Sequence, residues 1–249
     1  MPAEADRTLH VRARLRPTAG FTLDVEFDAP PGVTVLFGPS GAGKSTTLAA
    51  IAGLARPLAG RIALGDTPWF DAEQRVDVAV HRRRVAYVFQ SLALFPHMTG
   101  TANVAYGMPP SMDRDARAAR AAELLGRLHV AHLADRRPPT YSGGEAQRVA
   151  LARALAIDPR AVLLDEPFSA LDRELRIALV AELRDQLREL GVPVVFVTHH
   201  RQEARALGDR LVILDGGRVK SLGKVQDLAP GPADMSFDET PLDPDGALR

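Results

Sequence analysis

The sequence contains no cysteine, and aromatic residues make up only 5% of its 249 positions. The lack of cysteine excludes a disulfide framework, thiolate chemistry and a metal site built from cysteine. Lysine and arginine number 31, and aspartate and glutamate also number 31, so there is no excess of positive charge. Proteins that bind polyanions are usually basic, and we therefore expect no nucleic-acid partner.

Long apolar runs are lacking as well. Residues 192–197 form one of the longest, whereas a membrane-spanning helix needs roughly 20 apolar residues. The N-terminal segment, residues 1–16, holds Glu4, Asp6 and four arginines without an apolar run. We expect neither a signal peptide nor an anchor there. If this protein works at a membrane, another protein must hold it in place.

Apolar segments of two kinds predict the β-structure. Alternating patterns at residues 9–15 and 21–27 predict two half-buried, antiparallel strands. Nearly continuous apolar segments at 33–37, 161–164 and 194–197 predict buried strands of a parallel sheet. Each of these three ends in polar or glycine residues, and the carboxyl ends of parallel strands form a common ligand-binding edge. The fold class is therefore predicted to be α/β.

Helical patterns fill most of the remaining chain. Residues 173–190 predict a helix that crosses between two parallel strands. Between residues 95 and 139 no strand pattern appears. The sequence there is rich in alanine and arginine, which predicts helices, one of them at residues 114–128. A hairpin is predicted at 211–220 around a glycine-containing turn. From residue 229 onward proline, aspartate and glycine dominate, which is typical of a poorly ordered tail.

A glycine-rich loop lies between the first buried strand and a helix start. Residues 38–45 fit the P-loop pattern G-x-x-x-x-G-K-[ST]. The N–H groups of such a loop turn toward phosphate oxygens, and the helix N-terminus adds roughly half a positive charge. We expect Lys44 to bind the β- and γ-phosphates of ATP and Ser45 to bind Mg²⁺. The predicted nucleotide-binding residues of this loop are Gly38, Pro39, Ser40, Gly41, Ala42, Gly43, Lys44, Ser45 and Thr46.

Two adjacent carboxylates, Asp165 and Glu166, follow the second buried strand. In isolation such a pair is more often a solvated acidic turn. With a P-loop upstream, the position is that of a Walker B pair. Asp165 is then predicted to hold Mg²⁺, and Glu166 to polarise the attacking water as general base.

A second anion-binding segment is predicted at Ser142, Gly143, Gly144 and Glu145, which precede a helix. Free N–H groups, a hydroxyl and the end of the helix dipole would face the anion there. Alone, this segment would be an ordinary N-cap. Together with the P-loop it resembles the signature motif of ABC ATPases, with Tyr141 and Glu145 in place of the usual Leu and Gln. Neither replacement falls on Ser142 or Gly144, the positions that the family uses on phosphate.

The resemblance to ABC ATPases covers residues 21–228, with the motifs in the order of the family. It implies that Gln90 contacts Mg²⁺ and water and relays the nucleotide state to a membrane partner. It also implies that Asp172 belongs to a D-loop and that His199 hydrogen-bonds the γ-phosphate. His200 stands where the family often has Asp, and it is the alternative to His199 as the histidine that binds the γ-phosphate.

The same resemblance implies a P-loop NTPase fold: an ABC-type ATPase core with an N-terminal antiparallel β region and an inserted α-helical subdomain. We expect the ATPase domain over residues 1–228, with the helical subdomain at about 91–157, and a separate tail over 229–249. Residues 91–98 would either receive a coupling helix of a permease or pack the helical subdomain. Phe21 would either stack on adenine or pack in the core.

In this family, ATP is clamped between the P-loop of one copy and the signature motif of another. The resemblance therefore implies a head-to-tail dimer with a second copy, integral-membrane permease subunits, and indirectly a solute-binding protein. It places the chain at the cytoplasmic face of the cell membrane, as a peripheral protein.

The transported solute is implied by a closer resemblance to one group of ABC ATPases. Stretches at 38–46, 84–90, 102–108 and 217–223 look most like the ATPase of molybdate importers. Many of those carry an additional C-terminal oxyanion-sensing domain, for which a chain that stops at Arg249 has no room: either that domain is absent or the chain is incomplete. Importers of sulfate, thiosulfate, phosphate or polyamines are the alternatives.

Two other classes of P-loop protein are disfavoured. An ABC ATPase acting on DNA would carry a long coiled-coil insertion, which this sequence lacks. A small-molecule kinase would need no signature motif, whereas this sequence resembles one at residues 142–145.

Two further clusters are predicted to be structural. Arg82, Arg83 and Arg84 are expected to form a solvated surface run. His129 and His132 stand at helical spacing without an adjacent carboxylate cluster in the sequence, so we do not expect them to bind metal.

Overall fold

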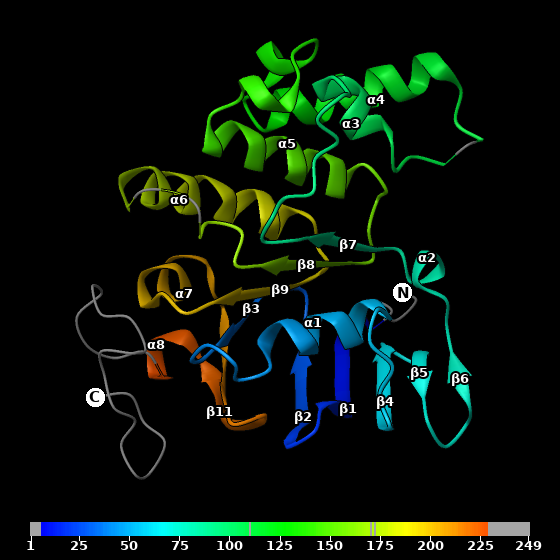
Figure 1. Ribbon diagram of the computed structural model, residues 1–249, viewed down its shortest axis with the longest axis vertical. Coiled ribbons are helices and arrows are strands. Elements are labelled where there is room, and N and C mark those ends of the chain that lie inside the picture. Colours follow the sequence, from blue (N-terminus) through cyan, green and yellow to red (C-terminus); the bar gives the residue numbers. More distant parts are fainter. Residues whose placement is uncertain (1–5, 110, 170, 172, 229–249) are drawn as a thin grey trace, which may run out of the picture.

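The computed structural model describes residues 6–109, 111–169, 171 and 173–228. Its centre is an eleven-stranded sheet in the order β6-β5-β4-β1-β2-β11-β10-β3-β9-β8-β7 (Figure 1). The strands are β1 (Leu9–Thr18), β2 (Phe21–Ala29), β3 (Gly32–Phe37), β4 (Ala59–Leu64), β5 (Thr67–Asp71), β6 (Val76–Asp77), β7 (Val85–Val88), β8 (Ala161–Asp165), β9 (Pro193–Thr198), β10 (Arg210–Asp215) and β11 (Arg218–Lys224). The helices are α1 (Lys44–Ala52), α2 (Val80–Arg83), α3 (Gly100–Ala105), α4 (Arg114–Arg127), α5 (Gly143–Leu155), α6 (Arg173–Glu189), α7 (Arg201–Leu207) and α8 (Val225–Leu228), with short 3₁₀ turns η1 (Ala131–Leu133) and η2 (Pro138–Thr140).

The strands β10, β3, β9, β8 and β7 are parallel neighbours. β8 and β9 are buried along their whole length, because helices cover both faces of this part of the sheet. Their alternate residues enter two apolar cores, one shared with α1 and the other with α5, α6 and α7. The predicted α/β fold with buried parallel strands is confirmed, and α6 is the predicted crossover helix.

An antiparallel region occupies the other half of the sheet. β1 pairs with β2 from Leu9 opposite Ala29 onward, as the alternating patterns predict, and β4 pairs with the other edge of β1. β10 and β11 form the predicted hairpin. The sequence did not predict β4, β5 and β6, although β5 carries Trp69, one of the largest fully buried side chains. This region packs against α1 and contributes apolar side chains to the core that α1 shares with the parallel strands.

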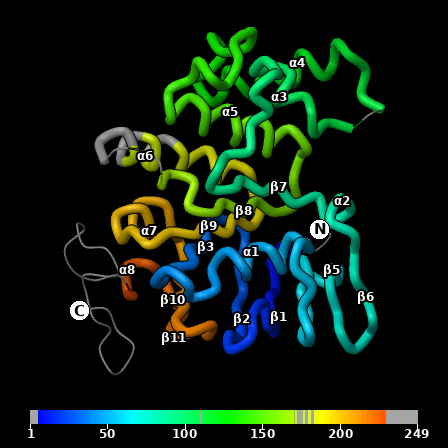
Figure 2. The backbone as a smooth tube through the Cα atoms, viewed as in Figure 1, coloured from blue at the N-terminus to red at the C-terminus, as the bar shows by residue number. Residues whose placement is uncertain are grey.

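The helices α3, α4 and α5 form a group beyond β7, on the opposite side of the molecule from β1 and β2 (Figure 2). Asn103 of α3 is fully buried, and its side chain accepts a hydrogen bond from the N–H of Phe95 and donates to the carbonyls of Phe95, Met98 and Thr99. These bonds fix the segment 91–98 onto the helical group. Among the described helices, none is both long and apolar enough to cross a membrane.

The prediction of a solvated arginine run at residues 82–84 is wrong for its middle member. Arg83 is 1% exposed, and its Nη1 donates to the carbonyls of Ala50 and Ile51, at 3.0 and 2.8 Å, in the last turn of α1. Its Nε donates to the carbonyl of Val78 at 2.9 Å. The guanidinium donates to carbonyls at the end of a helix, where few backbone donors remain, and its Nη2 also donates to Oδ1 of Asp77 at 3.3 Å, so burial of the charge is offset by these contacts.

Candidate nucleotide-binding site

The loop between β3 and α1 is shaped by close contacts that only glycine permits. A Cβ atom on Gly38 would lie 2.0 Å from the carbonyl oxygen of Leu214. Gly43 has a φ of +101°, and a Cβ there would lie 2.5 Å from Cδ1 of Leu23. The two glycines therefore let the loop pack against β10 and β2 while its exposed residues, Ser40 and Gly41 among them, face outward.

Lys44 is turned back over this loop. Its side chain is 5% exposed, and its ammonium donates to the carbonyls of Gly38 and Pro39 at 2.8 and 3.0 Å and lies 3.8 Å from Oε1 of Glu166. Two of these acceptors are neutral carbonyls of the loop itself. Phosphate oxygens carry charge and accept stronger hydrogen bonds, so the ammonium is held where it can exchange those carbonyls for a phosphate.

Ser45 and Asp165 meet although 120 residues separate them. The Ser45 hydroxyl donates to Oδ1 of Asp165 at 2.9 Å, and the Tyr87 hydroxyl donates to Oδ2 at 3.0 Å. Burial raises the pKa of Asp165, while the two hydroxyls and Lys44 act in the opposite direction. Both oxygens of a nearly buried carboxylate are thus oriented by hydroxyl groups.

Glu166, the next residue, stands in a strained turn. Its φ of +43° is unfavourable for a residue with a side chain. The N–H of Glu166 donates to the Val197 carbonyl of β9 at 3.1 Å, and its own carbonyl accepts from the N–H of Ser169 at 3.1 Å. These two bonds hold the turn in place and direct its carboxylate toward Lys44 and His199. Strain of this kind is concentrated at functional sites.

The two adjacent histidines differ in their surroundings. Nδ1 of His199 lies 3.3 Å from Oε1 of Glu166, and the side chain is one-third exposed. Burial lowers the pKa of His200 to about 4, with further contributions from His199 and Arg176. His200 is therefore neutral at pH 7, and His199 is the histidine that contacts the acidic pair. This geometry favours His199 over its alternative.

Gln90 shares a cleft with Asp165. Phe89, Gln90, Ser91, Asp165 and Ser169 line this cleft, and Nε2 of Gln90 donates to the Ser169 hydroxyl at 3.3 Å. The hydroxyl of Ser45, the carboxylate of Asp165 and the amide oxygen of Gln90 are oxygen donors of the kind that Mg²⁺ prefers. The donor set fits the predicted ion.

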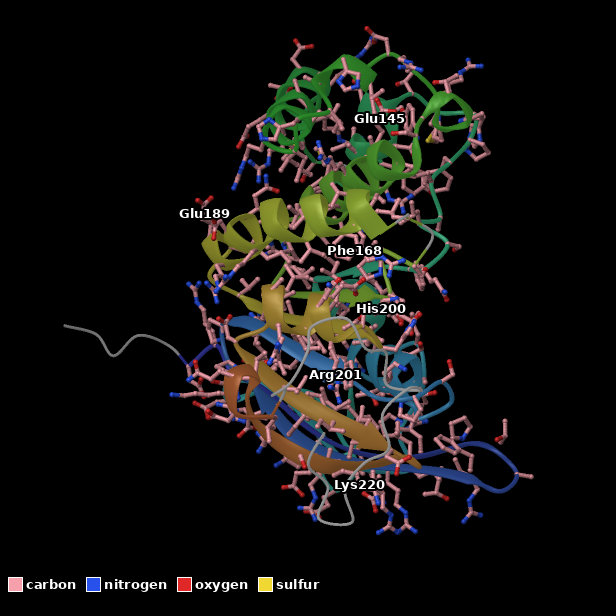
Figure 3. The ribbon with its side chains drawn as sticks, turned by 90° about the vertical axis from the view of Figure 1, so that its left-hand side faces the viewer. Glu145, Phe168, Glu189, His200, Arg201 and Lys220 are labelled. Atoms are coloured by element: carbon pink, nitrogen blue, oxygen red, sulfur yellow. The ribbon has the colours of Figure 1, made fainter. Side chains whose placement is uncertain are left out.

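The signature segment lies elsewhere on the chain. Ser142 is the N-cap of α5, and its hydroxyl accepts from the N–H of Glu145 at 3.3 Å while the Glu145 carboxylate accepts from the N–H of Ser142 at 2.7 Å. His132 lies 2.8 Å from the other oxygen of Glu145, a proximity that the sequence did not reveal. Figure 3 shows Glu145 in the helical group, well apart from His200 at the sheet edge. Asp172 lies outside the described residues.

A buried polar network that the sequence did not predict lies behind the histidines. The Thr198 hydroxyl donates to Oε2 of Glu203 at 2.5 Å, and Nε of Arg176 lies 3.6 Å from Oε1. Nη2 of Arg176 donates to the carbonyl of Leu171 at 2.8 Å. Burial raises the pKa of Glu203. The end of β9 is thereby connected to the segment that precedes α6.

Phe21 packs beside the P-loop. It is partly buried against the core that α1 shares, and a Cβ on Gly43 would lie 3.4 Å from its ring. Its packing role is confirmed, whereas stacking on adenine stays a prediction. The structure thus brings together Lys44, Ser45 and the acidic pair with His199 and Gln90, and it does not bring the signature residues to them.

Taken together, a P-loop at the carboxyl edge of a parallel sheet and an acidic pair beside it define an α/β protein built to bind a nucleotide. The sequence profile of ABC transporters matches residues 23–169. The chain belongs to the ABC transporter family, as the resemblance in its motifs implied.

Several curated relatives share most of this chain. It is 45% identical over 219 residues to the molybdenum import ATP-binding protein ModC of Thiobacillus denitrificans, with 87% of this chain covered. It is 44% identical over 220 residues to ModC of Rhizobium meliloti, again with 87% covered. The identity to ModC 1 of Azotobacter vinelandii is 42% over 232 residues, or 92% of this chain. The chain spans about 60% of the length of these relatives.

Solved structures of ABC cassettes have the same fold. The dimeric ATP-binding cassette MJ0796, in a post-hydrolysis state bound to ADP and Pi, matches with a TM-score of 0.72 at 29% identity. The match covers 88% of this chain and 99% of that one. The predicted ABC-type ATPase fold is confirmed.

Proposed function

We propose that this chain binds and hydrolyses ATP and thereby energises an importer of molybdate or a similar oxyanion. The observation that carries the proposal is the convergence of Lys44, Ser45, Asp165, Glu166 and His199 on one edge of the sheet. The cargo is supported by the relatives, which are named molybdenum import ATP-binding proteins.

The loop from Gly38 to Thr46 binds the triphosphate of ATP. Its N–H groups and the start of α1 face the phosphates, and the ammonium of Lys44 leaves the carbonyls of Gly38 and Pro39 to bind phosphate oxygens. Ser45, Gln90 and Asp165 would hold Mg²⁺, which would neutralise charge on the phosphate oxygens. Phe21 stands beside the loop, where its ring can also meet the adenine.

Glu166 is the general base of hydrolysis. Its carboxylate accepts a proton from the water that attacks the γ-phosphorus, while the bond from phosphorus to the β–γ bridging oxygen breaks. His199 lies beside it and donates a hydrogen bond to the γ-phosphate. The ion pair of Glu166 with Lys44 keeps the base near the phosphate to be cleaved.

A second copy of the chain completes the site. Ser142, Gly143, Gly144 and Glu145 begin α5 in the helical group, apart from the P-loop of the same chain (Figure 3). In a head-to-tail dimer this segment binds the γ-phosphate held by the partner. Loss of the γ-phosphate removes these contacts and lets the two copies separate.

The opening acts on integral-membrane permease subunits, with the chain peripheral at the cytoplasmic face of the membrane and a solute-binding protein delivering the cargo. Segment 91–98 follows Gln90 and is the docking site we propose. Phe89 and Tyr106, beside it, are 41% and 60% exposed. We propose one ATPase domain over residues 1–228, with the helical subdomain at about 91–157; residues 1–5 and the predicted tail, 229–249, lie outside the described residues.

Reconstitution with the cognate permease and binding protein in vesicles tests this function. We expect ATP-dependent uptake of molybdate in competition with sulfate, thiosulfate, phosphate and polyamines. Preferential uptake of another solute would reassign the cargo. ATP turnover that responds to DNA or to a small phosphate acceptor, and not to the permease, would contradict the transport function.

A further inference from the structure

Tyr87 contacts the proposed Mg²⁺ ligand Asp165 from a part of the chain that no nucleotide-binding motif includes. Its hydroxyl donates to Oδ2 of Asp165 at 3.0 Å, while Ser45 donates to Oδ1. A tyrosine hydroxyl is protonated at neutral pH and can donate one hydrogen bond. The carboxylate is thus held at both oxygens.

The sheet register explains how Tyr87 reaches this carboxylate. Tyr87 of β7 lies opposite Leu163 of β8, and Asp165 follows two residues later on the same face of that strand. Both Tyr87 and Leu163 belong to the core that α1 shares, and α1 begins with Lys44 and Ser45. A long side chain at position 87 can therefore extend forward along β8 to its end.

A stacked ring fixes the direction of the Tyr87 side chain. The rings of Tyr87 and Phe89 are 4.2 Å apart with an angle of 21° between their planes. Phe89 lines the same cleft as Gln90 and Asp165. The strand that leads to Gln90 is therefore joined to the acidic pair by a hydrogen bond that is independent of Gln90 itself.

We infer that Tyr87 is a positioning residue of the Mg²⁺ site, whose hydroxyl holds Asp165 in the orientation that binds the ion. A Ser45 hydroxyl that binds the ion through its oxygen can still donate its proton to Oδ1, and the Tyr87 hydroxyl holds the other carboxylate oxygen, Oδ2. Hydrogen bonds to metal ligands fix their orientation and raise metal affinity. The inference rests on the proposed function of this site as a Mg²⁺-ATP site.

Tyr87→Phe isolates the hydroxyl, because the ring and its packing remain. ATP binding is measured by calorimetry as a function of Mg²⁺ concentration, in a Glu166→Gln background that prevents turnover. We expect the Mg²⁺ concentration for half-maximal binding to rise on the order of tenfold. Binding of ATP without Mg²⁺ and the melting temperature should remain close to those of the parent.

Tyr106→Phe is the matched control, since its ring is exposed and contacts Phe95 instead. It should leave the Mg²⁺ dependence unchanged. In the catalytically active background, Tyr87→Phe should likewise require more Mg²⁺ but reach a near-normal rate at saturation, and Tyr87→Met, a second variant without the hydroxyl, should behave alike.

Two results would overturn the inference. One is an unchanged Mg²⁺ dependence in Tyr87→Phe. The other is an equal loss of ATP binding with and without Mg²⁺, accompanied by a lower melting temperature, because that pattern reports only packing. Failure of the proposed transport function has a different signature: Mg²⁺-dependent ATP binding would persist in the parent while solute uptake is absent.

Discussion

Nδ1 of His199 lies 3.3 Å from the carboxylate of Glu166, at the ends of two neighbouring parallel strands. In the proposed function, Glu166 is the base and His199 the hydrogen-bonding partner, and their contact lets the two act on one phosphate and one water. The division of roles within this unit can be tested by separate substitutions.

Glu166→Gln keeps the shape of the side chain but removes the proposed base. We expect Mg-ATP binding to persist and turnover to fall by about 10² to 10⁴, the effect typical of a lost general base. The variant should also accumulate as an ATP-bound dimer, measured by size-exclusion chromatography with and without ATP. Near-normal turnover would show that another residue is the base.

A histidine comparison accompanies that test. His199→Ala should reduce turnover strongly, whereas His200→Ala should have a much smaller effect, because the half-buried His200 has a pKa lowered to about 4 and His199 is the histidine in contact with Glu166. Steady-state phosphate release measures both. The reverse order would make His200 the functional residue.

The cap of α5 predicts a dependence on pH. Hydrogen bonds from His132 and from the N–H of Ser142 lower the pKa of Glu145 from 4.5 to about 2. A depressed folded-state pKa contributes stability above the unfolded value, and this contribution is lost as the pH falls from 4.5 toward about 2. Urea unfolding of the parent and of Glu145→Gln should therefore give a difference at pH 6 that shrinks by pH 3. A constant difference would argue against the capping role of this carboxylate.

The buried Arg83 and its exposed neighbour Arg82 should differ in their contribution to the free energy of unfolding. Arg83→Met leaves helix-end carbonyls of α1 without their donor, and we expect a loss of about 2–4 kcal/mol in the free energy of unfolding. Arg82→Met, at an exposed position, should change it by no more than about 0.5 kcal/mol. Urea denaturation of both variants measures the contrast, and similar values for the two would contradict the capping by Arg83.

The network behind the histidines is suited to a double-mutant cycle. Glu203→Gln keeps an acceptor for Thr198 but removes the charge that faces Arg176, and Arg176→Met removes the donor to Leu171. We expect the double variant to lose less stability than the sum of the single losses, with a coupling of about 1 kcal/mol or more. Strict additivity would show that the two side chains act independently.

Much of the site could be predicted because its chemistry is local. The P-loop needs glycines and a lysine in a fixed pattern, and the acidic pair directly follows an apolar strand, so residues 38–46 and Asp165 carry their own signal. Parallel strands explain why these segments meet. The contact between Glu166 and His199 follows from the pairing of β8 with β9.

The remaining features depend on register and side-chain path, which a single sequence does not specify. Tyr87 reaches Asp165 because of one particular pairing of β7 with β8. Arg83 and its neighbours are alike in sequence, and only the packing of α2 on the end of α1 separates them. The short strands β5 and β6 were not predicted because they lack a long alternating pattern.

The hydrogen bond from Glu166 to Val197 has a mechanical consequence. His199 lies two residues beyond that carbonyl, so β9 carries both the support of the base and the histidine that it faces. In the proposed ATPase cycle, a displacement of β9 would move the two side chains together and preserve their spacing. Each round of turnover would then begin with the pair already assembled.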